Sequence, residues 1–141
     1  MGYLLKLNGM SLLYACVLFV HIELMMNVYR IERLTGWTDA GKLIDAAQVL
    51  IFICFTVLLF IINKRWIGKQ KWRYVTTILW FPYLYALIRS YAVLYPITNP
   101  QEVPLPAVGL ITLGEMLVFP LYVAAIQFFS KDFAAAFNTK G

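Results

Sequence analysis

Four long runs of apolar residues divide this chain and limit the folds it can adopt. The runs cover about residues 7–29, 40–63, 75–95 and 105–129. A helix needs about 20 apolar residues to cross a hydrocarbon core about 30 Å thick, and each run is near that length. Because the runs are continuous rather than alternating, they favour helices over the strands of a membrane β-barrel.

The composition supports the same class of protein. Hydrophobic residues make up 62% of the 141 residues and charged residues only 13%. A soluble domain has roughly 45–50% apolar and about 25% charged residues, so this chain lacks the polar groups to cover such a surface. We therefore predict an all-α membrane protein, an antiparallel four-helix transmembrane bundle, with residues 1–141 forming a single integral membrane domain. No small-residue cleavage site follows the first run, so we expect a retained helix rather than a signal peptide.

The basic residues in the loops predict an orientation. Four crossings place both termini and the middle loop on one side of the membrane and the other two loops on the opposite side. The first side holds eight Lys and Arg residues and the second holds three. The positive-inside rule therefore places both termini in the cytoplasm. The middle loop, residues 63–73, mixes basic residues with Trp66 and Trp72. We interpret it as a contact with lipid headgroups, and we expect no nucleic-acid binding, because a loop this short offers no binding fold.

Three charged residues, Glu23, Arg89 and Glu115, interrupt the apolar runs. A charge at bilayer depth costs at least about 2.5–3.5 kcal/mol on insertion scales, so it normally faces protein or water and has a partner. At 1.5 Å per residue, Glu23 and Arg89 lie roughly 9 Å from the outer ends of their helices, and Glu115 roughly 13 Å. We therefore expect Arg89 to pair with Glu115 or Glu23 in the outer half of the bundle, with an inner half that is almost wholly apolar.

Further polar side chains lie close to these charges in the sequence. Asn27 and Arg30 follow Glu23 by four and seven residues and share its helix face, whereas His21 points elsewhere, and Tyr85 shares a face with Arg89. The candidate ligand-binding or proton-relay residues are Glu23, Arg89, Glu115, Tyr85, Asn27 and His21. Two interpretations stay open: a small polar cavity that opens outward, and an interhelical ion pair that fixes helix packing.

Two prolines lie within the third and fourth runs. Pro82 and Pro120 are each about nine residues from the cytoplasmic ends of their helices. Kinks at matching depth would splay these helices and leave a crevice that lipid can enter. The alternative is that both prolines are tolerated without a special role, as is common in membrane helices.

Several kinds of chemistry can be argued against. A single His excludes bis-His haem ligation within the chain, and no zinc spacing or Gly-rich phosphate loop is present. Cys16 and Cys54 lie within apolar runs without a Cys-x-x-Cys motif, which argues against dithiol redox chemistry. No nucleophile–base pair is visible either. We therefore expect no cofactor and no metal, and we consider an enzyme the third choice of function.

Two functional hypotheses remain ahead of an enzyme. The first is a non-enzymatic membrane protein that binds membrane lipid, another amphipathic ligand or a partner membrane subunit through its third and fourth helices. The second is a small proton- or ion-coupled transporter acting as a homodimer, in which Glu23 or Glu115 carries the coupling proton. An assembly factor or a toxin-immunity protein is also compatible with the sequence.

Short motifs at the chain ends and in one loop carry a resemblance. They are Gly2-Tyr-Leu-Leu, a basic loop that follows Leu58-Leu-Phe, and the tail Phe128-Phe-Ser-Lys followed by Phe137-Asn. In these features the chain resembles a family of small bacterial four-helix membrane proteins of unknown function, although the tail departs from that family at Asp132, where its members tend to be basic. The resemblance implies a four-helix topology and a place in the bacterial cytoplasmic (inner) membrane. It implies no activity.

Overall fold

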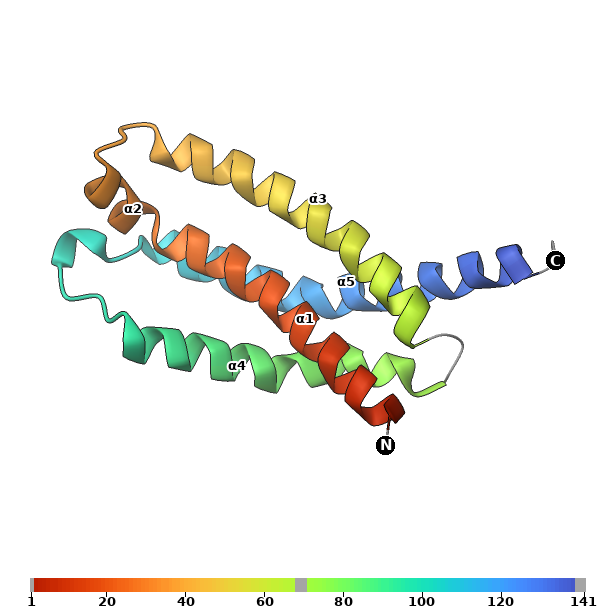
Figure 1. The fold of residues 1–141 in the computed structure, drawn as a ribbon. Helices are drawn as coiled ribbons and strands as arrows, with labels where there is room; N and C mark the ends of the chain where they lie inside the picture. Colours follow the sequence, from red (N-terminus) through yellow and green to blue (C-terminus); the bar gives the residue numbers. More distant parts are fainter. Residues whose placement is uncertain (1, 68–70, 139–141) are drawn as a thin grey trace.

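The structure is a computed structural model that describes residues 2–67 and 71–138. Within these ranges the chain is helical, with turns and short loops between the helices (Figure 1). The elements in chain order are α1 (Gly2–Met26), α2 (Val28–Thr35), α3 (Ala40–Trp66), the 3-10 helix η1 (Lys71–Val75), α4 (Thr76–Leu94), the 3-10 helix η2 (Pro100–Glu102) and α5 (Pro106–Asn138).

Four segments are long and apolar enough to cross a membrane. They are Gly2–Met26, Ala40–Trp66, Lys71–Leu94 and Pro106–Ser130. This confirms the number of helices predicted from the four apolar runs. The first helix begins and ends earlier than the predicted range of 7–29, and the fourth continues beyond residue 129.

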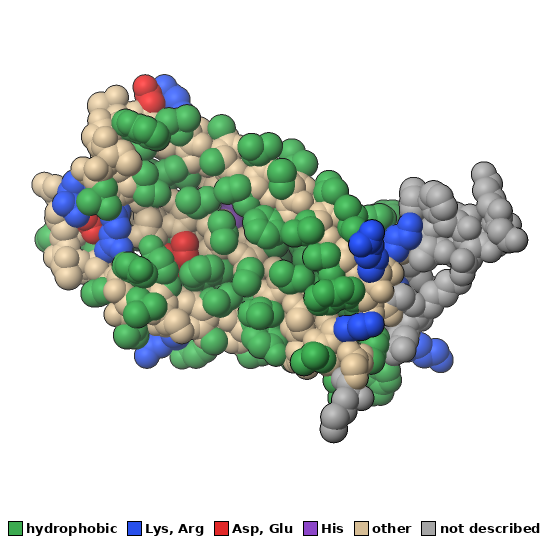
Figure 2. Space-filling model, viewed as in Figure 1, with side chains coloured by type: hydrophobic (Ala, Val, Ile, Leu, Met, Phe, Trp, Pro, Cys, Tyr) green, Lys and Arg blue, Asp and Glu red, His purple; other side chains and the backbone are tan. Residues whose placement is uncertain are grey.

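The long helices run lengthwise between the two ends of the molecule. Both chain ends and the connection from α3 to α4 lie at one end, which we call the terminal end (Figure 1). Helix α2 and the connection from α4 to α5 lie at the other, which we call the distal end. In the space-filling view, hydrophobic side chains cover most of the surface between these ends, while charged side chains lie mainly at the ends (Figure 2). That distribution is expected of helices that cross a bilayer.

Helix α1 is the most buried of the four spanning segments. It packs most extensively against α4 and α3, while α5 packs against α3 and makes smaller contacts with α4 and α1. All four segments contribute side chains to one hydrophobic core, among them Met10, Tyr14, Leu59, Trp80, Leu84, Phe119 and Val123. Large hydrophobic side chains remain exposed on the outer faces of α3, α4 and α5. Such an exposed apolar surface is expected of a membrane protein, because a soluble monomer rarely exposes so large an apolar surface.

Asn27 interrupts the helix where the first apolar run was predicted to continue. Its side-chain amide donates to the backbone oxygen of Glu23 and to Glu23 Oε2, both at 2.9 Å. A side-chain amide that bonds to the preceding turn competes with the regular backbone ladder. The backbone N–H of Asn27 still donates to the oxygen of Glu23 at 3.0 Å. Helix α1 ends at Met26, and α2 continues in a new direction (Figure 1). Gly36 ends α2 with a φ of 69°, a left-handed conformation that suits glycine.

Prolines in α4 and α5 are accommodated without a break in either helix. Both helices continue through Pro82 and Pro120, so the predicted kinks do not interrupt them. Pro106 is the first residue of α5, a position that suits proline because the first N–H of a helix has no intrahelical partner.

Candidate functional site

Glu115 on α5 has a polar partner on α1. His21 Nε2 lies 2.9 Å from Glu115 Oε1, and the two side chains are 28% and 25% exposed. His21 is five residues before the end of α1, and Glu115 is nine residues after the start of α5. Both predicted candidates thus meet in the distal half of the molecule, in a pair that the sequence did not reveal.

Arg89 does not form the expected ion pair. Its side chain is exposed on α4, and it lies within 4.0 Å of neither Glu115 nor Glu23, all three being described residues. The physical reason is the orientation of its helix face: Leu84 is buried, whereas Tyr85, one residue further on, is 62% exposed. Arg89 follows Tyr85 by four residues and shares that outer face. Tyr85 and Arg89 are therefore apart from the His21–Glu115 pair.

The three side chains predicted on one helix face, those of Glu23, Asn27 and Arg30, do not all contact one another. Glu23 and Asn27 are hydrogen-bonded to each other, as described above. Arg30 instead donates from Nε to Glu102 Oε2 at 2.9 Å and from its terminal nitrogens to the backbone oxygens of Tyr95 and Pro96. The predicted group therefore separates at the end of α1 into the Glu23–Asn27 pair and Arg30.

Glu102 connects α2 to the loop before α5. Its side chain is 2% exposed, and Arg33 Nε donates to its Oε1 at 2.7 Å in addition to the bond from Arg30. The hydrogen bond from Arg30, together with that from Arg33, holds the pKa of Glu102 below its usual value, while the bond to Glu102 raises the pKa of Arg30. This distal ion-pair cluster of Glu102, Arg30 and Arg33 was not predicted from the sequence. The sequence feature that could have indicated it is Glu102, an acidic residue in a loop without basic residues. Arg30 and Arg33 were predicted on the same side of the membrane as this loop.

A second polar network lies at the terminal end, where the inner half was predicted to be almost wholly apolar. That prediction is wrong. Arg73 is 2% exposed and donates from Nε to Gln127 Oε1 at 2.9 Å and from a terminal nitrogen to Ser130 Oγ at 2.7 Å. Asn63 also donates to Ser130 Oγ, and Gln127 Nε2 donates to Thr76 Oγ1 at 2.8 Å. The network links η1 and the start of α4 to α3 and α5, so Arg73 is not the headgroup contact expected of a loop residue.

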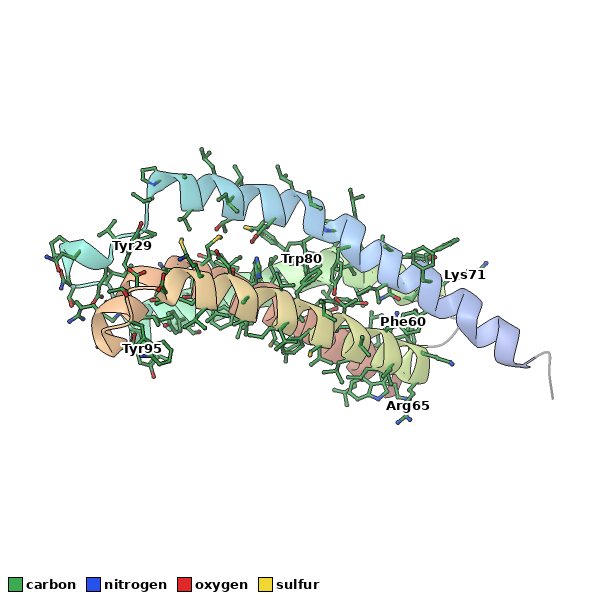
Figure 3. The ribbon with its side chains drawn as sticks, turned by 90° about the horizontal axis from the view of Figure 1, so that it is seen from above. Tyr29, Phe60, Arg65, Lys71, Trp80 and Tyr95 are labelled. Carbon is green, nitrogen blue, oxygen red and sulfur yellow. The ribbon has the colours of Figure 1, made fainter. Side chains whose placement is uncertain are left out.

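A cavity of about 470 Å³ lies in the distal half of the molecule, between α1, α3 and α5. Its walls are mostly apolar, and its polar members are His21, Glu115, Gln48 and Tyr122. Gln48 Nε2 donates to the backbone oxygen of His21 at 3.0 Å. Tyr122 is bonded through its hydroxyl to Thr56 Oγ1 at 2.8 Å. In Figure 3, Tyr29 and Tyr95 lie near the distal end of the molecule, and Arg65 and Lys71 lie near the terminal end.

Aromatic rings form part of the cavity wall. The rings of Phe52 and Tyr122 have centroids 5.1 Å apart, and Phe119 packs on Tyr122 at 5.3 Å. Trp80 packs edge-to-face on Phe119 at 4.9 Å and thereby connects this wall to α4. Large packed rings have few rotamers, so they keep the shape of the wall fixed.

The chain was compared with protein-family models, with curated proteins and with solved structures, and no match was found. The resemblance to small bacterial four-helix membrane proteins therefore stays a prediction. In the part of the chain whose side chains are described, no three His, Cys, Asp or Glu residues lie close enough to hold a metal ion. The chemistry of the cavity consequently depends on the His21–Glu115 pair within apolar walls.

Proposed function

We propose that this chain is an antiparallel four-helix integral membrane protein that binds a membrane lipid or another amphipathic molecule in the cavity between α1, α3 and α5. The observation that carries the proposal is the cavity itself. Its volume of about 470 Å³ lies within the roughly 300–1,000 Å³ that is typical of ligand pockets. Such pockets combine apolar walls with a small number of placed polar groups, which describes this one.

The depth of the cavity favours a ligand that arrives from the bilayer. Glu115 lies nine residues after the start of α5, and Gln48 lies eight residues after the start of α3. At 1.5 Å per residue these positions are roughly 13 Å and 12 Å from the distal ends of their helices. An aliphatic chain at this depth meets apolar side chains, while its polar end reaches His21 and Glu115. The proposed site differs from the sequence-based hypothesis, which used the third and fourth helices.

Glycine at position 114 allows a direct test. Gly114 lines the cavity, and a Cβ atom added there meets no other atom within 4 Å. The Cβ atom of a new side chain therefore has space at this position, and we expect the ring of Gly114→Phe to occupy part of the cavity and compete with a ligand. Gly109 is equally open on the same helix but is not part of the cavity lining, so Gly109→Phe is a matched control.

The measurement is native mass spectrometry of protein released from the membrane in a mild detergent. The wild-type protein and Gly109→Phe should retain a lipid-sized ligand, and Gly114→Phe should not. Equal retention by all three proteins would place the ligand outside the cavity. A wild-type protein released without any ligand would refute the proposal, and a co-purifying polypeptide instead of a lipid would indicate a partner membrane subunit.

We also propose that both termini face the cytoplasm of a bacterial inner membrane. The support is the excess of Lys and Arg in the termini and the middle loop, as the positive-inside rule requires. A reporter fused after residue 141 should be active only when it is of a type that functions in the cytoplasm. Activity of a periplasm-specific reporter at that position would reverse the orientation.

A proton-coupled transporter acting as a homodimer is the second candidate. The observation that favours it is the 2.9 Å contact between His21 and Glu115, because an imidazole and a carboxylate at that distance can exchange a proton. Proton-coupled flux into liposomes should then fall in Glu115→Gln. Flux that is unchanged in both Glu115→Gln and Glu23→Gln would remove this candidate.

A further inference from the structure

The two carboxylate oxygens of Glu115 have different surroundings. Oε1 contacts His21 Nε2 at 2.9 Å. Oε2 is buried, and no hydrogen-bond donor of the described residues reaches it. A buried acceptor without a donor carries the full cost of its lost hydration. The site is therefore more favourable when a donor that does not belong to this part of the chain approaches Oε2.

The cavity is the direction from which such a donor can come. Glu115 is one of the residues that line it. The terminal torsion of a Glu side chain is broad and roughly two-fold, so rotation of the carboxylate can turn Oε2 toward the cavity without a change in the helix. This rotation moves both oxygens of the planar carboxylate, so a donor that approaches from the cavity rearranges the contact between Glu115 and His21.

Other polar groups in the cavity wall already have partners. The amide nitrogen of Gln48 is bonded to the backbone of α1, and the hydroxyl of Tyr122 is bonded to Thr56. None of the described residues that line the cavity is Lys or Arg. A ligand head group therefore meets a hydrogen-bond acceptor in Glu115, and only His21 is available to offset a negative charge.

We infer that the cavity selects amphiphiles whose head group donates a hydrogen bond and carries no negative charge, namely long-chain alcohols or amines, and that Glu115 is the residue that binds this head group. The inference rests on the proposed lipid-binding function. It follows from the sign of the interaction: an O–H or N–H donor satisfies Oε2, whereas a phosphate, sulfate or carboxylate would lie beside a like charge.

Three probes that share the same aliphatic chain and differ only in their head group test the inference. The full chain is placed in phosphatidylcholine nanodiscs with hexadecanol, hexadecylamine or hexadecyl sulfate at equal mole fraction, and bound probe is measured by native mass spectrometry. Nanodiscs that carry Gly114→Phe give the background. The alcohol or the amine should bind about tenfold or more better than the sulfate, since a hydrogen bond to a charged group contributes at least that much.

Two carboxylate variants assign the preference to a residue. Glu115→Gln removes the charge and keeps an amide oxygen as acceptor. The preference for the alcohol or the amine over the sulfate should therefore fall to less than about threefold, while the aliphatic chain of each probe still binds. Glu23→Gln is the matched control, because Glu23 is not among the cavity-lining residues, and its preference should equal that of the wild-type protein. An unchanged preference in Glu115→Gln would overturn the role of Glu115.

The outcomes separate this inference from the function on which it rests. If all three probes bind equally to the wild-type protein and Gly114→Phe loses all of them, the lipid site stands and the head-group selection is refuted. If the sulfate binds best, the selection is also refuted. If no probe binds above the Gly114→Phe background, the proposed function fails as well. A preference for only the alcohol or only the amine supports the inference and identifies the head group.

Discussion

Two buried glutamines allow the terminal network to be tested by equivalent substitutions. Gln127 is 0% exposed and Gln48 is 7% exposed, and both lie in spanning helices. The change to Leu in each case replaces an amide by an apolar side chain of similar size. Gln127 accepts a hydrogen bond from Arg73 Nε and donates one to Thr76 Oγ1. Gln48 donates one, to the backbone oxygen of His21.

The different partners set the expected magnitudes. Loss of the Gln127 oxygen leaves a charged donor of Arg73 buried without that partner, and such groups cost about 1.5–3 kcal/mol. The neutral bond to Thr76 adds about 0.6 kcal/mol, the average for polar bonds between membrane helices. We therefore expect Gln127→Leu to lower the free energy of unfolding by about 2–4 kcal/mol. Gln48→Leu removes one neutral bond and should cost about 0.6 kcal/mol.

The assay is unfolding of the purified protein in mixed micelles with increasing SDS, followed by circular dichroism. Gln101→Leu serves as a control, because Gln101 is exposed and lies outside the spanning helices; its stability should equal that of the wild-type protein. The reasoning would be refuted if Gln48→Leu cost as much as Gln127→Leu, or if Gln127→Leu were neutral. Equal costs would mean that the bond to Arg73 does not distinguish the two glutamines, and a neutral Gln127→Leu would mean that Arg73 obtains little stabilisation from Gln127.

Two further predictions concern the charged groups. In a double-mutant cycle, His21→Phe and Glu115→Gln should show a coupling of at least about 0.5 kcal/mol in the same SDS assay, whereas Arg89→Ala and Glu115→Gln should be additive within that margin; the opposite pattern would restore the pair predicted from the sequence. The second concerns Glu102, whose pKa is lowered in the folded protein. A carboxyl group of this kind stabilises the fold above its unfolded pKa, and the contribution is lost as the pH falls through the folded pKa. The protection factors of the α2 amides, which correct for the slower intrinsic exchange in acid, should therefore fall as the pH is lowered in the wild-type protein, and in Glu102→Gln they should be low already at neutral pH; equal pH profiles of protection for the two proteins would contradict this.

The four helices that are long and apolar enough to cross a membrane could be predicted, because a bilayer would impose both this length and this composition. Each apolar run corresponds to one helix, and Pro106 begins α5 as its chemistry requires. The end of α1 could not be predicted by the same argument. Hydropathy continues past Asn27, whereas helix α1 ends just before this residue, where its side-chain amide bonds to Glu23.

The site was predicted less well because residue counting gives the depth of a side chain but not its direction. Arg89 lies at the expected level of α4, yet it is exposed rather than directed toward α1 or α5. Helices joined by a short loop are usually close neighbours, which would favour a pair between α4 and α5. In the structure α5 packs more extensively against α3 than against α4. This arrangement brings Glu115 to His21 and places the cavity between α1, α3 and α5.

Uncharged polar residues were also left out of the prediction of the polar sites. Gln127, Ser130 and Asn63 hardly change the hydropathy of their helices, so the analysis of charges passed over them. Their positions on α5 and α3 nevertheless let them surround Arg73. A search for amides near the ends of apolar runs would have suggested that a loop arginine has partners inside the protein.

Gln127 in the terminal network and Glu115 in the cavity lie far enough apart to be separated by experiment. Gln127 follows Glu115 by twelve residues on α5, roughly 18 Å at 1.5 Å per residue. Substitutions more than about 7–10 Å apart without shared partners usually have independent effects. Gln127→Leu should therefore lower stability and leave the head-group preference of the cavity unchanged, whereas Glu115→Gln should change the preference. If Gln127→Leu also abolished the preference under conditions where the protein remains folded, ligand selection would depend on how the helices are held at the terminal end, and Glu115 alone would not explain it.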